Sequence, residues 1–135
     1  MTKVHLIKFL PGIAWFFIVI LLTCLPGDDI PTVGWLNDIY FDKWVHAGMF
    51  GGLVFLFSFP FFRIKIPDAK KIYYIVCITL AAIFWGLAIE FIQKYFIPGR
   101  SFDLLDWAAD TGGALASFWF VRTNLLNSSM GKRRR

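Results

Sequence analysis

The sequence predicts an all-α membrane protein: four transmembrane helices that form a small bundle, with both termini in the cytoplasm. Of the 135 residues, 58% are hydrophobic and only 17% are charged, against about 25% charged in an average soluble domain. A soluble chain of this length could not bury that much apolar surface. The apolar residues gather in four stretches, and most of the 14 lysines and arginines fall on one side of them.

The four apolar stretches give the expected spans of a single domain, residues 1–135. The first runs from about Phe9 to Leu25, and about 17 residues at ~1.5 Å each cross a slightly thinned bilayer core. The others run from about Trp44 to Phe62, from Ile72 to Ile97 and from Leu104 to Val121. The last stretch has Asp106 and Asp110 in its first turns, and we count it as a span because an even number of crossings fits the charges.

A cleaved signal peptide is the alternative for the first stretch. A signal peptide requires a small-x-small cleavage site, and no such site precedes Pro26. The segment Leu21-Leu22-Thr23-Cys24 resembles a lipoprotein cleavage box only faintly, because threonine replaces the usual glycine or alanine.

Basic residues orient the bundle. The amino terminus, the second loop and the end of the chain from Arg122 carry 2, 4 and 5 of them, 11 in all, and the other side carries Lys43, Lys94 and Arg100. The positive-inside rule then places both termini, including a basic tail at residues 123–135, in the cytoplasm. Topology and contact with anionic lipids explain this tail, so membrane lipids and not nucleic acid are the expected partners.

Polar residues gather at the outer ends of the expected helices. In chain order they are Asp42, Lys43, His46, Glu90, Gln93, Arg100, Asp103, Asp106 and Asp110. Glu90 lies about 27 Å along its helix from Ile72, near the outer interface. A charge inside a transmembrane helix costs about 2.5–3.5 kcal/mol at the bilayer centre and less near the edge. Glu90 therefore needs a partner, and Lys43, His46 and Arg100 are the only cations expected on the outer side besides Lys94. Asp42 and Asp103 alone are equally well explained as helix N-caps.

Small residues indicate which helices approach each other. The expected second helix has a GxxxG step and the fourth has two small-xxx-small steps: Gly48 with Gly52, Gly112 with Ala116, and Gly113 with Ser117. Such faces let helix backbones pack closely in lipid. We therefore expect the second and fourth helices to touch there, which brings His46 near Asp106 and Asp110.

The order and spacing of these motifs resemble the VanZ-like family of small bacterial membrane proteins. The motifs are Asp42-Lys43-x-x-His46, Glu90-x-x-Gln93, Pro98-Gly99-Arg100-Ser101-Phe102-Asp103-x-x-Asp106 and Gly112-Gly113. Asp110 departs from the family pattern, which usually has asparagine there. The resemblance implies the bacterial inner membrane and a cell-envelope setting. The family is named for a component linked to resistance to the glycopeptide teicoplanin, but the resemblance does not imply that this chain confers resistance.

Three classes of function are open. In the first, Lys43, His46 and Arg100 bind an anionic envelope ligand, such as a lipid phosphate or a glycopeptide-related component. In the second, a membrane-embedded hydrolase or transferase acts on an envelope lipid, with His46, Glu90 and Asp106 as catalytic candidates. The third is a structural membrane subunit. No cofactor or metal is expected in the preferred interpretation. In the enzyme alternative a divalent cation could be held by Asp42, His46, Glu90, Asp103 and Asp106.

The predicted topology can be tested by labelling. Single cysteines placed at Asp38 and at Pro67 lie in loops on opposite sides of the predicted membrane. In intact cells an impermeant thiol reagent should reach position 38 and not position 67, because the basic second loop is expected to stay inside. Labelling at position 67 alone would overturn the orientation.

Overall fold

The computed structural model describes residues 6–26 and 40–133, and every secondary-structure element in this part of the chain is helical. The elements are η1 (Leu6–Phe9), α1 (Leu10–Thr23), α3 (Phe41–Ser58), η3 (Phe59–Phe62), α4 (Asp68–Phe96) and α5 (Leu104–Arg133). The all-helical prediction is confirmed for these residues. Residues 1–5, 27–39 and 134–135, which carry part of the predicted charge pattern, lie outside the described residues.

Three of the helical stretches are long and apolar enough to cross a membrane. They are Leu6–Thr23, Phe41–Phe62 and Asp68–Phe96. α5 is not among them, because Asp106, Asp110 and several small polar residues lower its mean hydropathy. Large side chains such as Phe17, Leu21 and Phe84 remain exposed on the outside, as expected for helices that contact lipid. The fourth span stays a prediction.

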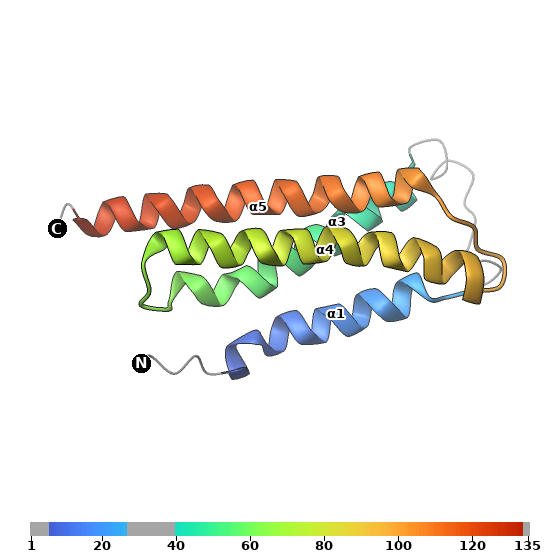
Figure 1. Cartoon of the computed structure of the whole chain (residues 1–135), viewed down its shortest axis with the longest axis horizontal. Helices are drawn as coiled ribbons and strands as arrows, with labels where there is room; N and C mark the ends of the chain where they lie inside the picture. Colours follow the sequence, from blue (N-terminus) through green and yellow to red (C-terminus); the bar gives the residue numbers. More distant parts are fainter. Residues whose placement is uncertain (1–5, 27–39, 134–135) are drawn as a thin grey trace.

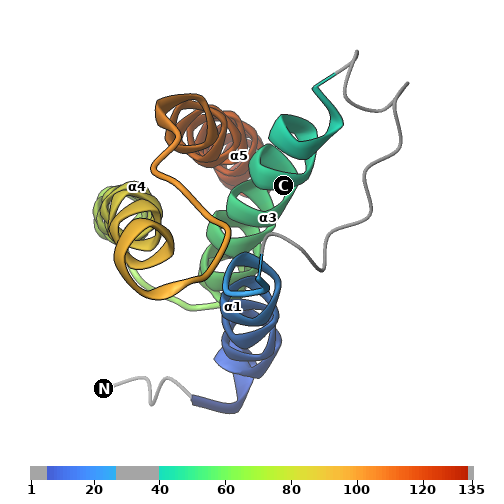
Figure 2. The same ribbon diagram turned by 90° about the vertical axis from the view of Figure 1, so that its right-hand side faces the viewer.

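The helices pack as a bundle in which α3 has the central place. Seen from one end, α3 lies between α1 and α5, and α4 packs beside α3 and α5 (Figure 2). The core lies between them, with Val19, Phe50, Val54 and Ala114 fully buried. The start of α1 and the end of α5 lie at one end of the bundle, and the start of α3 and the α4–α5 connection lie at the other (Figure 1).

α5 is longer than the sequence predicts. It continues to Arg133, beyond the predicted end at Val121, so residues 123–133 are helical. Within the part of α5 whose side chains are described, the Thr123 hydroxyl donates back to the Trp119 carbonyl at 2.9 Å. Leu125 is only 2% exposed and packs in an apolar cluster with Ile75 and Val121. This contact with α4 gives the segment an apolar face to bury, which favours continued helix.

The α4–α5 connection is short and tightly turned. α4 ends at Phe96, and Ile97 is extended with φ −108° and ψ 116°, because the proline that follows disfavours helical geometry. Gly99 has φ 70°, a left-handed conformation that glycine adopts without strain. The turn leads directly into Arg100 and then into α5.

α3 and α5 meet through small residues, as predicted. A Cβ atom on Gly113 would overlap the backbone carbonyl of Ala47, and one on Gly51 would lie 3.1 Å from the Gly113 carbonyl oxygen. The two backbones are therefore in direct contact, which only small residues allow.

The face of α3 that was predicted to contact α5 is offset by one residue from the face that does so in the structure. Gly48 has open space where a Cβ would be, and so does Gly112 on α5. Gly52 packs against α1, where a Cβ would lie 2.8 Å from Nε1 of Trp15. Because one residue turns a helix by about 100°, the GxxxG step at Gly48 and Gly52 does not face α5.

This seam gives a matched pair of substitutions. Gly113→Ala should lower the free energy of unfolding by about 1–3 kcal/mol, because the added methyl group pushes α5 from the backbone of α3. Gly112→Ala, in the same helix turn, should keep stability or raise it by up to about 1 kcal/mol, because its methyl group enters open space and alanine favours the helix. Unfolding in mixed micelles measures both, and equal effects would contradict the observed contact.

Candidate functional site

Titratable side chains from three helices and one loop meet at the end of the bundle where α3 begins and α4 ends. We call this set the polar cluster. It consists of Asp42, Lys43, His46, Glu90, Asp103, Asp106 and Asp110. Each is linked to another member by an ion pair or a hydrogen bond, so the seven form one network. All seven were predicted from the sequence to lie at one end.

Lys43 is the centre of the outer half of the polar cluster. Its Nζ atom lies 2.8 Å from Asp42, 2.7 Å from Asp103 and 2.6 Å from Asp106. An ammonium group has three donors, so all of them are occupied. Lys43 therefore joins the start of α3 to the α4–α5 connection and to α5, and it has no donor left for a further ligand.

Asp103 has two structural tasks. Its Oδ1 accepts a hydrogen bond of 2.8 Å from the Leu105 backbone N–H, so it caps α5 as the sequence suggested. Its Oδ2 accepts from Lys43. The Lys43 ammonium stabilises the ionised carboxylate and lowers the pKa of Asp103 below its ordinary value of 3.8.

His46 lies deeper, between two carboxylates of α5. Its Nδ1 shares a hydrogen bond of 2.9 Å with Oδ1 of Asp110, and its Nε2 lies 3.8 Å from Oδ2 of Asp106. His46 is 6% exposed and Asp110 is fully buried. The expectation that packing of α3 on α5 brings His46 near both carboxylates is confirmed.

Glu90 is fully buried, and its partner differs from the predicted one. The sequence suggested a cation, but Oε2 of Glu90 accepts a hydrogen bond of 2.7 Å from the backbone N–H of Asp103. Its other oxygen, Oε1, has no hydrogen-bond partner among the described residues. Glu90 therefore fixes the start of α5 against α4, and one of its oxygens remains free within the protein interior.

Two predicted residues do not join the polar cluster. Gln93 is 1% exposed, and its Nε2 donates a hydrogen bond of 2.9 Å to the Thr23 carbonyl at the end of α1. Arg100 is half-buried and forms no ion pair with a carboxylate of residues 6–26 or 40–133. The Nε atom of Arg100 is shielded and has no hydrogen-bond partner there either.

Gly86 shapes the site, although it is not among the residues predicted from the sequence. A Cβ at this position would lie 2.9 Å from Oδ2 of Asp110. The absence of a side chain thus lets the Asp110 carboxylate lie against α4, one turn from Glu90. An isolated glycine inside an otherwise apolar helix was the available signal, because such a residue often marks close packing.

The polar cluster contains more negative than positive groups. Five carboxylates face one lysine and one histidine.

The chain was compared with protein families, curated proteins and solved structures, and none of them matches it. The resemblance to the VanZ-like family therefore stays a prediction from motifs.

The Lys43–Asp103 pair predicts a specific pH dependence. Since the pKa of Asp103 is lowered in the folded protein, its stabilising effect is present above the unfolded value of about 3.9 and is lost as the pH falls through the folded value. Asp103→Asn should therefore be less stable than the wild type at pH 7, and the difference should shrink towards about pH 3. Thermal unfolding in detergent measures this, and a difference that is independent of pH would contradict the pairing.

Proposed function

We propose that the chain is a four-span protein of the bacterial inner membrane, with both termini in the cytoplasm and the polar cluster at the outer face. Three helices of suitable length and hydropathy support this proposal. So does the arrangement of the bundle, in which the start of α1 and the end of α5 share one end (Figure 1). The basic residues of the sequence favour the cytoplasm for that end.

We further propose that the protein binds an anionic envelope ligand, such as a lipid phosphate, and that Arg100 contacts the anion. The observation that carries this proposal is the difference among the three predicted cations. Lys43 and His46 are already held by carboxylates, whereas the Arg100 guanidinium has no carboxylate partner among the described residues. A planar guanidinium can form two parallel hydrogen bonds with a phosphate.

The carboxylates have a positioning role in this proposal. Glu90 accepts a hydrogen bond from the backbone N–H of Asp103, and Lys43 donates one to the Asp103 side chain, so the residue that ends the short Arg100 segment is attached to both α4 and α3. Gly99 turns the backbone just before Arg100. The loop that carries the guanidinium is thereby held in one conformation, which reduces the entropy lost when an anion binds.

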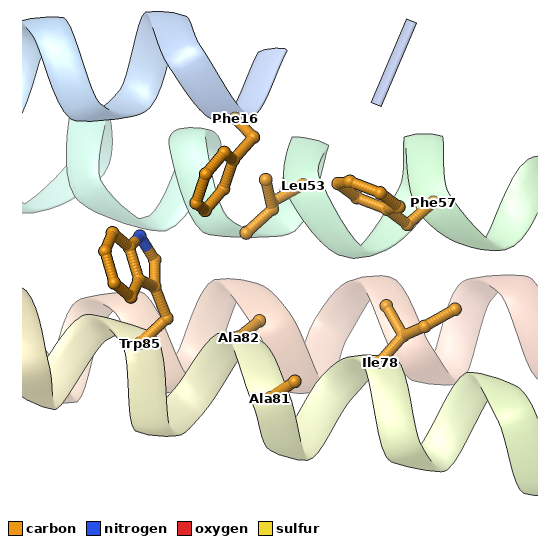
Figure 3. A pocket seen from close by; sticks show the side chains of 7 residues that line it. All are labelled: Phe16, Leu53, Phe57, Ile78, Ala81, Ala82 and Trp85. Carbon is orange, nitrogen blue, oxygen red and sulfur yellow. The ribbon is translucent and has the colours of Figure 1, made fainter. Parts of the chain in front are cut away.

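An apolar pocket gives the proposed lipid a place for part of its chain. The pocket has a volume of about 210 Å³ and lies between α1, α3 and α4. Figure 3 shows the rings of Phe16, Phe57 and Trp85 and the side chains of Leu53 and Ile78 around it. Every residue that lines it is apolar, so it suits a hydrocarbon segment and not a headgroup.

An enzyme is the second candidate, and the His46–Asp110 pair favours it. A histidine whose Nδ1 is held at 2.9 Å by a buried carboxylate has the arrangement of a general base that is oriented by its partner. In this proposal a hydrolase or transferase acts on an envelope lipid, and turnover as well as binding depends on His46. A structural membrane subunit, the third class, needs neither a free guanidinium nor a pocket.

The anion proposal predicts the effect of a conservative change at Arg100. Arg100→Lys keeps the charge but loses the second hydrogen bond to a phosphate, so binding of a polyprenyl phosphate in nanodiscs should weaken about five- to tenfold. The thermal midpoint should stay within error of the wild type, since Arg100 forms no ion pair with described residues.

The matched control is Lys94→Gln, which removes one positive charge from the same end of the bundle. Lys94 is exposed and lies over the ring of Tyr95 at 5.2 Å. Binding to this variant should stay within about threefold of the wild type, because screening weakens its long-range effect. If Arg100→Lys binds as the wild type does, or if Lys94→Gln is equally impaired, the proposed contact is wrong.

A further inference from the structure

Three buried side chains of the polar cluster, one from each of three helices, converge on a single point. His46 comes from α3, Glu90 from α4 and Asp110 from α5. One ring nitrogen of His46 and one carboxylate oxygen of each acid all lie within 4.8 Å of one another. The three residues are 6%, 0% and 0% exposed, so the protein and not solvent surrounds this point.

Two of these side chains have an unused oxygen. Oε1 of Glu90 and Oδ2 of Asp110 are buried and have no hydrogen-bond partner among the described residues. Buried polar atoms are nearly always satisfied, so each exception requires an explanation. Two such oxygens beside one histidine indicate that a further binding partner belongs between them.

The charge of the site requires compensation from a cation or from protons. Lys43 is occupied by Asp42, Asp103 and Asp106, and no lysine or arginine of residues 6–26 or 40–133 pairs with Glu90 or Asp110. Buried carboxylates are expensive unless they are paired or coordinate a metal. A divalent cation would neutralise both at once.

We infer that His46, Glu90 and Asp110 form a binding site for a divalent transition-metal ion. One imidazole nitrogen with two carboxylate oxygens suits Zn²⁺ or Mn²⁺ better than Mg²⁺ or Ca²⁺, which prefer oxygen ligands alone. Ligand atoms that share an ion at about 2.1 Å lie about 3–4 Å apart. The side chains can therefore close on the ion by movements of about an ångström.

Neighbouring residues support the three ligands. Oδ2 of Asp106 lies 3.8 Å from Nε2 of His46, so a shift of about 1 Å would let it accept the Nε2 proton when Nδ1 binds the ion. Carboxylates commonly orient metal-bound histidines in this way. The Asp103 backbone fixes the other oxygen of Glu90, and Gly86 leaves room for Asp110 against α4. The site thus has ligands, orienting groups and space.

The test uses the full-length protein in detergent, without a polyhistidine tag and with no lipid phosphate added. After removal of metal with a chelator, calorimetric titration with ZnCl₂ or MnCl₂ should show one ion per chain and a higher thermal midpoint. Glu90→Gln and Asp110→Asn preserve side-chain size and should weaken binding at least about tenfold. Asp68→Asn, which removes a carboxylate from the start of α4, is the matched control and should bind like the wild type.

A second measurement keeps the inference testable if the ligand variants fail to fold. In a His5→Gln background His46 is the only histidine of the chain, and pulsed EPR of the Mn²⁺-loaded protein should show one imidazole nitrogen. No saturable ion binding, a spectrum without nitrogen, or equal binding by Glu90→Gln and the wild type would overturn the site and leave a proton-sharing cluster instead. Because no lipid is present, these outcomes are separate from the Arg100 proposal.

Discussion

The constraint on which the rest of the structure depends is the cost of placing carboxylates among apolar helices. Five of them lie at one end of the bundle, and an unpaired charge in such surroundings is strongly unfavourable. Lys43 forms ion pairs with three of them, and His46 shares a hydrogen bond with Asp110. The backbone N–H of Asp103 donates a hydrogen bond to one oxygen of Glu90. These contacts join α3, α4 and α5 at that end, so the charges that would destabilise the helices separately hold them together.

The polar contacts are possible only because the helices come very close. Gly113 lets α5 touch the backbone of α3 at Ala47, and Gly86 lets Asp110 lie against α4. Larger residues at either position would separate His46 from Asp110 or Asp110 from Glu90. Close backbone packing and the charged network therefore depend on each other, and the loss of one weakens the other.

The same network divides the positive groups into two kinds. Lys43 and His46 are bound internally, whereas Arg100, on a turn set by Gly99, is left without a carboxylate among the described residues. The proposed anion contact is therefore the Arg100 guanidinium, and the proposed cation position lies among the buried side chains of His46, Glu90 and Asp110. The two positions differ, and they would take ligands of opposite charge.

The sequence by itself determined the helical class, three apolar stretches and the gathering of polar residues at one end. These follow from hydropathy and from the fixed rise of a helix, which are local properties. Tertiary structure decided which atoms meet. Gly51 and not Gly48 faces α5, Gln93 turns to the end of α1, and Glu90 accepts from a backbone N–H and not from a cation. A helix turns by about 100° per residue. Partners therefore depend on how each helix is rotated and how closely it packs, and no single segment contains that information.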